Sequence, residues 1–171
     1  GQYALCVRLL EELLAARPDQ AHAMVYGALA YYRHLMGQAF DLQPLETAPL
    51  GHTYPFRREE AQVLRFAMSQ GSQRAVFLLG CLLYDKRHYA EGGRLFEQYT
   101  QAVPGDYLGW RCLAIACFSH LGRQDEALAL MKKAVDMQDS QQLLIETFYL
   151  MVKLNVEPAE KIDFLSRHPM E

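Results

Sequence analysis

The side chains that could do catalytic or metal-binding chemistry are scattered along this sequence. No two of its six histidines have the spacing of paired metal ligands on one helix; they are His22, His34, His52, His88, His120 and His168. Glu11 and Glu12 are adjacent carboxylates in a helical pattern, as are Glu59 and Glu60. Neighbours on a helix point about 100° apart, so neither pair can flank a substrate from both sides. Phosphate-loop, zinc-protease and hydrolase motifs are absent. We therefore expect no catalytic residue, no metal site, no cofactor and no enzymatic activity.

The cysteines also lack the spacing of a zinc or thiol-redox site. They lie in helical, mostly apolar contexts without a Cys-x-x-Cys pair, at Cys6, Cys81, Cys112 and Cys117. Cysteines in such contexts are usually buried free thiols. Free thiols favour a reducing compartment such as the cytoplasm, although the sequence leaves the compartment of the protein open.

Composition predicts a folded domain and excludes two classes of partner. The chain has 171 residues, of which 51% are hydrophobic, and a formal net charge of -3. Its basic residues are dispersed, so we expect no nucleic-acid binding. The longest apolar stretch, residues 75–84, is about half the roughly 20 residues that span a bilayer, so we expect no membrane insertion. A helical pattern that begins directly after Gly1 suggests a fragment of a longer protein.

The hydrophobic pattern of the chain is helical throughout, so helices must position any functional side chain. Apolar residues at spacings of three and four, separated by Gly, Pro, Asp and Ser breakers, predict about nine helices near 3–16, 20–36, 57–70, 73–86, 88–102, 106–121, 124–137, 140–154 and 158–167. Ser140 is placed to cap one of them, and Pro158 suits the first turn of another. One long loop, near residues 37–56, is too apolar to lie free in solvent and should pack along the helices; a role in partner binding or in lining the groove is the alternative.

A repeat of 34 residues organises the second half of the pattern, because Leu79-Gly80 recurs as Leu113-Ala114. The two repeats, near 73–106 and 107–139, resemble the tetratricopeptide repeat, whose small and aromatic positions they reproduce. This resemblance implies an all-α, tetratricopeptide-like helical-hairpin array, or α-solenoid, forming a single domain over residues 1–171. Gly92 and Gly93 depart from the pattern inside a helix, at a cost of roughly 1 kcal/mol each relative to Ala.

A narrower resemblance rests on three segments: TYPFRREEAQVLRFA at 53–67, LLGCLLYDKRHYAEGGRLFEQY at 78–99 and PAEKIDFLSRHP at 158–169. They are similar to the repeat region of large bacterial proteins in which an uncharacterised β-rich domain, like those of carbohydrate enzymes, precedes tetratricopeptide repeats. The resemblance implies a bacterial source, an upstream β-rich domain and a link to carbohydrate metabolism. It supplies no catalytic residue.

In tetratricopeptide arrays the first helix of each repeat lines a concave groove. By repeat position, the predicted groove contacts for a protein or peptide partner are Tyr32, Arg74, Phe77, Tyr84, Arg111 and Phe118. Aromatic rings offer contact area at low entropic cost, and Arg can clamp a carboxylate. An aromatic stripe at helical spacing is also the pattern of a core, and this alternative stays open for Phe77, Phe118 and Met24.

We therefore expect a non-catalytic scaffold that binds a protein or peptide through its concave face. Two alternatives remain: an architectural module that packs on the upstream domain or self-associates, and an accessory that shapes a sugar site on that domain. The architectural alternative predicts an adhesive first helix around Leu5, Leu9 and Leu13, because truncated arrays lack polar caps. It leaves homo-oligomerisation open.

Overall fold

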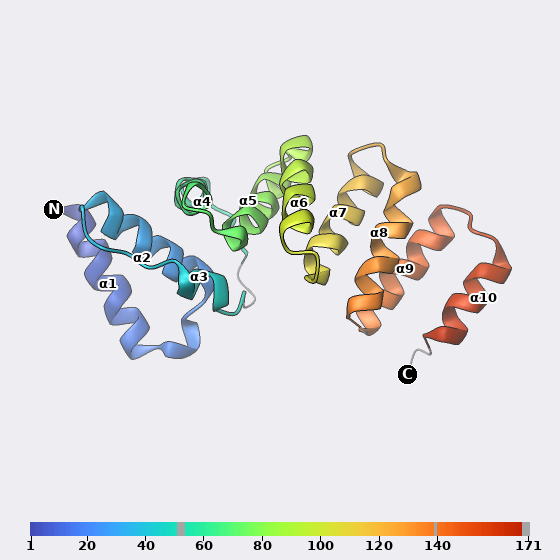
Figure 1. Ribbon diagram of the computed structural model, residues 1–171, viewed down its shortest axis with the longest axis horizontal. Coiled ribbons are helices and arrows are strands. Elements are labelled where there is room, and N and C mark those ends of the chain that lie inside the picture. The colour runs from blue at the N-terminus through green and yellow to red at the C-terminus, as the bar shows by residue number, and fades with distance from the viewer. Residues whose placement is uncertain (51–53, 139, 169–171) are drawn as a thin grey trace. The chain divides into compact units, whose positions relative to one another are not determined.

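The computed structural model describes residues 1–50, 54–138 and 140–168. These residues form ten α-helices and one short 3-10 helix, with no strand among them (Figure 1). The prediction of an all-α fold is confirmed, and the bounds of the nine expected helices agree with the observed ones to within three residues. The chain divides into two compact units, Gly1–His88 and Tyr89–Glu171. The single domain expected over residues 1–171 stays a prediction, and each unit is described by itself below.

The first unit is built around two helices, α2 and α5. Its elements are α1 (Gln2–Ala16), η1 (Pro18–Gln20), α2 (Ala23–Leu35), α3 (Gln43–Thr47), α4 (Glu60–Ser69) and α5 (Gln73–Asp85). Helix α2 contacts α1, α3 and α4, while α5 packs on α3 and α4. The sequence of α5 is almost wholly apolar, so most of its surface is buried. Ser72 begins this helix, because its Oγ accepts a hydrogen bond from the Ala75 amide at 3.0 Å.

The segment predicted as a long loop, residues 37–56, contains α3, which the sequence did not predict. Leu45 of α3 is 0% exposed and sits against α2 at Gly27, where an added Cβ would lie 3.6 Å from the Leu45 Cδ1 atom. The expected packing of this segment along the helices is thus confirmed at Leu45. Tyr54 and Phe56 remain exposed instead. Residues 51–53, which include His52, lie outside the described residues.

The second unit consists of five consecutive helices, of which α6 to α9 each pack on the next. They are α6 (Tyr89–Ala102), α7 (Tyr107–Ser119), α8 (Gln124–Met137), α9 (Gln141–Lys153) and α10 (Pro158–Arg167). The expected cap of α9 is present, since the Leu143 amide donates to Ser140 Oγ at 3.3 Å. Pro158 occupies the first turn of α10, also as predicted. Helices α7 and α8 are the two halves of the repeat near 107–139.

Close approach of α6 and α7 depends on a small residue. A Cβ added to Gly109 of α7 would lie 2.7 Å from Cδ1 of the Tyr99 ring. That ring is 3% exposed, and its hydroxyl donates to the Asp106 carboxylate at 2.5 Å. Because the ring is held at both ends, it cannot easily give way.

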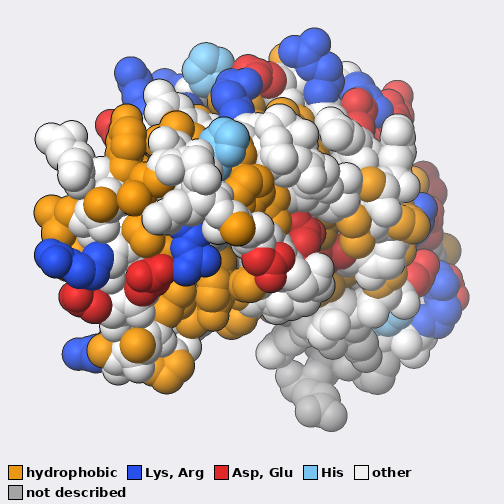
Figure 2. All heavy atoms as spheres, turned by 60° about the vertical axis from the view of Figure 1, so that its left-hand side comes forward, with side chains coloured by type: hydrophobic (Ala, Val, Ile, Leu, Met, Phe, Trp, Pro, Cys, Tyr) orange, Lys and Arg blue, Asp and Glu red, His pale blue; other side chains and the backbone are white. Residues whose placement is uncertain are grey.

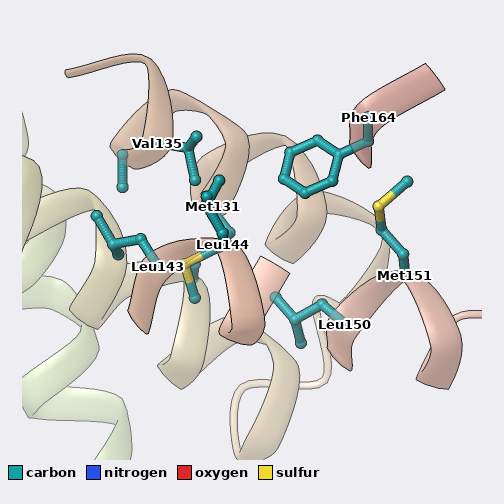
Figure 3. Packing of buried hydrophobic residues seen from close by; sticks show 9 residues of the cluster. Met131, Val135, Leu143, Leu144, Leu150, Met151 and Phe164 are labelled. Atoms are coloured by element: carbon teal, nitrogen blue, oxygen red, sulfur yellow. The ribbon is translucent and has the colours of Figure 1, made fainter. Parts of the chain in front are cut away.

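The core of the second unit joins α7, α8, α9 and α10. It is a buried cluster of Ala114, Met131, Ala134, Val135, Leu143, Leu144, Leu150, Met151 and Phe164. Figure 3 shows the Phe164 ring reaching from α10 toward the side chains of α8 and α9. An ion pair between Lys132 Nζ and Glu160, at 2.5 Å, also links α8 to α10. Helix α10 is therefore attached to the core mainly through Phe164, since an ion pair at the surface contributes little.

The four cysteines are all free thiols, as predicted. Their burial was only partly predicted, because Cys117 is buried whereas Cys6, Cys81 and Cys112 are half-buried. Burial raises the pKa of the Cys117 thiol, an effect that Arg123 opposes and that Glu126 and Glu97 reinforce.

Candidate partner-binding cleft

An apolar cleft lies in the second unit, between α7 and α9. It has a volume of about 380 Å³ and is lined by Ile115, Phe118, Ser119, Met131, Ile145, Glu146, Tyr149 and Leu150. All but Ser119 and Glu146 present hydrocarbon or aromatic surface. No residue of α10 lines the cleft. We call this site the α7/α9 cleft.

The α7/α9 cleft has a fixed floor and an exposed rim. Met131 and Leu150, which form the floor, belong to the buried core cluster. Ile145 and Tyr149 stand one helical turn apart on α9 and are 54% and 53% exposed. Large apolar side chains at such exposure are ordinary when single, whereas these two together form an exposed apolar patch beside the cleft.

An ion pair closes one edge of the cleft. The Arg111 guanidinium donates from Nε and Nη2 to the two oxygens of Glu146 at 2.7 and 2.6 Å, and Gln142 donates a further hydrogen bond at 3.0 Å. Burial by itself would raise the pKa of Glu146, but the hydrogen bonds from Arg111 and Gln142 outweigh it and hold that pKa below its usual value. The Glu146 carboxylate is therefore charged and already hydrogen-bonded at neutral pH.

Two of the six predicted groove residues meet at this cleft. Phe118 lines it, half-buried, and Arg111 forms its edge through Glu146. Arg111 was predicted to clamp a carboxylate of a partner. In the structure, the carboxylate that it holds is that of Glu146 in the same chain. Whether either residue contacts a partner stays a prediction.

The other four predicted residues lie in the first unit. Tyr32 lines a separate cavity of about 360 Å³ that also contains His22, Arg57 and Glu59. Its ring stacks on Tyr3 at a centroid distance of 6.0 Å. Burial raises the pKa of the Tyr32 hydroxyl, and Cys6, Tyr31 and Tyr3 add to that effect.

Helix α5 carries the remaining three residues, Arg74, Phe77 and Tyr84. Arg74 donates from Nη2 to the Glu46 carbonyl at 3.0 Å, and its amide donates to the Glu46 carboxylate at 3.1 Å, so it fastens α3 to α5. Phe77 is 0% exposed, which agrees with the core alternative and not with a surface contact. Tyr84 is half-buried.

Sequence reasoning did not single out the α9 residues Ile145, Glu146 and Tyr149. The signal for Ile145 and Tyr149 was present, because apolar residues four apart on a helix share a face. The pairing of Arg111 with Glu146 spans 35 positions, and no local pattern reveals it.

The described residues offer neither a metal site nor a transmembrane helix. Across 1–50, 54–138 and 140–168, no group of three or more His, Cys, Asp or Glu side chains could hold a metal ion. None of the described helices combines the length and the hydrophobicity that a bilayer crossing needs.

Known proteins are similar to this chain in two respects, the repeat sequence and the helical fold. Residues 77–141 match the family model of the tetratricopeptide repeat. A solved structure of MamA from Desulfovibrio magneticus RS-1 is similar at 14% sequence identity and a TM-score of 0.59, over 98% of this chain and 84% of that chain. MamA from AMB-1 is similar at 17% identity and a TM-score of 0.56, over 98% of this chain and 89% of that one.

At such identities the likeness concerns the fold alone. No curated protein sequence matches the chain. Residues 77–141 are therefore similar to the tetratricopeptide repeat, within a chain whose all-helical fold resembles that of the MamA structures.

Proposed function

We propose that this protein is a non-catalytic helical-repeat scaffold and that it binds a protein or peptide segment at the α7/α9 cleft. The observation that carries the proposal is the pair of half-exposed side chains, Ile145 and Tyr149, beside a cleft with a buried floor. Tetratricopeptide sequence over residues 77–141, which include α7 and α8, supports an interaction role for this region.

The chemistry of the cleft indicates what the partner presents. Arg111 and Glu146 satisfy each other, so neither needs a charge from the partner. The lining is otherwise apolar, apart from the Ser119 hydroxyl. A volume of about 380 Å³ is near the lower end of the roughly 300–1,000 Å³ typical of ligand pockets. The partner segment should therefore insert a large apolar side chain and leave its polar groups at the rim.

A random peptide library tests the proposal, because it contains candidate segments of every composition. Peptides are selected from the library against the protein, and their affinities are measured by fluorescence anisotropy. Replacing Ile145 or Tyr149 by Ser should weaken binding about tenfold or more, because interface anchors of this kind contribute at least about 1.4 kcal/mol each. Ala129→Ser, at an exposed position of α8 outside the cleft, is the matched control and should change nothing.

The proposal would be contradicted if the wild type and all three variants bound the selected peptides with the same affinity. Selected peptides without a large apolar residue would contradict it too. The relation to bacterial proteins with an upstream β-rich domain, and with it a supporting role beside a carbohydrate-active domain, stays a prediction from the resemblance of residues 53–169.

A further inference from the structure

The outward face of α1 in the first unit is apolar and has no cover among the described residues. Leu5 and Leu9 of this helix are 46% and 52% exposed, whereas its opposite face, at Val7, is buried. Figure 2, which turns the side bearing α1 toward the viewer, shows hydrophobic side chains at the surface between charged ones. Within the described part of its unit, α1 packs mainly on α2 and η1, which leaves this face open.

The exposed residues of α1 form a stripe that is suited to another helix. Leu5, Leu9 and Leu13 recur every four residues and thus follow one side of the helix. Leu13, at the edge of the stripe, is half-buried. Arg8 and Glu12 flank the stripe, both with side chains more than 60% exposed, at 69% and 64%. The Arg8 Nε and Glu12 Oε1 atoms are 3.7 Å apart. An ion pair at this exposure contributes little to stability, so either side chain can pair with another charge at little cost.

We propose that the occupant of this face is a second copy of the chain, with α1 packed antiparallel on α1 around a two-fold axis beside Leu10. Such an axis puts residue 8 of one copy opposite residue 12 of the other, so each Arg8 meets the Glu12 of the second copy. A parallel two-fold arrangement would instead put the Arg8 and Glu12 of each copy on opposite flanks of the contact, where they could not pair. The charge pattern of the stripe is therefore self-complementary in one orientation only, as an isologous contact requires.

The same axis also interleaves the leucines. With a rise of 1.5 Å per residue, Leu9 lies about 1.5 Å from the axis along the helix, and Leu5 and Leu13 lie about 7.5 and 4.5 Å from it on opposite sides. Leucines of the two copies then alternate about every 3 Å along the contact, so the side chains of one helix fill the gaps of the other. The Arg8–Glu12 pairs and the interleaved leucines are thus both consistent with the same antiparallel register.

Sedimentation velocity over a range of protein concentrations is the test. The wild type should show a monomer–dimer equilibrium. Leu9→Glu should raise the dimer Kd about a hundredfold, because a leucine is lost from each copy at about tenfold apiece. Ile162→Glu is the matched control: Ile162 is 65% exposed on α10 of the other unit, and its replacement should leave the dimer unchanged. Circular dichroism checks that both variants are folded.

Charge reversal tests the orientation. Arg8→Glu alone and Glu12→Arg alone should each abolish the homodimer, the two variants mixed should form a heterodimer, and the double reversal should restore self-association. A wild type that stays monomeric at every concentration overturns the proposal. So does a dimer that Leu9→Glu leaves intact, since the contact would then lie elsewhere. The α7/α9 cleft is not involved, so either result leaves the proposed function standing.

Discussion

Replacing Glu146 by Gln should destabilise the second unit by about 2 kcal/mol. Glu146 accepts two hydrogen bonds from Arg111, at 2.6 and 2.7 Å, and each side chain of the pair is 25% exposed. Removing one partner of a fully buried pair costs about 3–5 kcal/mol, whereas an exposed pair contributes up to about 1 kcal/mol. A pair that is three-quarters buried falls between these limits. The variant also leaves the Arg111 charge without its carboxylate.

The chain provides its own probe for this measurement. Trp110, its single tryptophan, precedes Arg111 on α7, and its indole donates to the Pro104 carbonyl at 2.8 Å. Tryptophan fluorescence in urea therefore follows unfolding of the second unit. For about 80 residues, a loss of about 2 kcal/mol corresponds to a fall in Tm of roughly 8–16 °C. A double-mutant cycle of Glu146→Gln with Arg111→Met isolates the pair itself and should give a coupling energy of about 1.5 kcal/mol.

Acid should remove this stabilisation, because the pKa of Glu146 is lower in the folded protein than in the unfolded chain. A depressed carboxyl pKa stabilises the fold above the unfolded value, about 4.3, and the benefit disappears as the pH falls through the folded value. The difference in unfolding free energy between wild type and Glu146→Gln should thus be constant near neutral pH and shrink in acid. A coupling energy below about 0.5 kcal/mol, or a difference that does not respond to acid, would refute this reasoning.

Three further outcomes follow from the packing. Gly109→Ala should destabilise the second unit by about 1–2 kcal/mol in urea, because the new Cβ would lie 2.7 Å from the fixed ring of Tyr99; Gly105→Ala, with open space around it, should be close to neutral. Leu45→Ala should cost about 2–5 kcal/mol and expose the segment of α3 to limited proteolysis, since this side chain is 0% exposed. Cys117 should react with a chromogenic thiol reagent only on unfolding, because it is buried and burial raises its thiol pKa. Its reaction should therefore form a slow phase after that of the half-buried cysteines. A Cys117→Ser variant that still shows this slow phase would contradict the prediction.

Local signals in the sequence were enough to predict most helices. Helix α8 occupies residues 124–137 as expected, because its amphipathic pattern is bounded by breakers on both sides. Helix α3 was missed because five residues are too few to show a period, and it is held by the burial of Leu45 on α2. Gly92 and Gly93 did not interrupt α6 despite their low helix propensity. Gly93 leaves room for Leu121, whose Cδ1 atom would be 2.7 Å from an added Cβ.

The candidate site was predicted less completely, for a physical reason. Repeat position assigns Phe118 and Arg111 to one face of α7, and the structure has both beside the α7/α9 cleft; their contact with a partner stays a prediction. Repeat position could not reveal that Arg111 pairs with Glu146, or that Arg74 binds Glu46, because both contacts join residues far apart in the chain. Such contacts depend on tertiary packing, which also decided that Phe77 is core.

The most direct test of the proposed function is to locate a bound peptide on the chain. A peptide selected against the protein is synthesised with a photoreactive group in place of its large apolar residue, irradiated in the complex and mapped by tandem mass spectrometry. Our account predicts insertion at the cleft lining, within residues 115–119 and 145–150. Insertion into α1, or into the first-unit cavity around Tyr32, would contradict it and move the binding surface to the other unit.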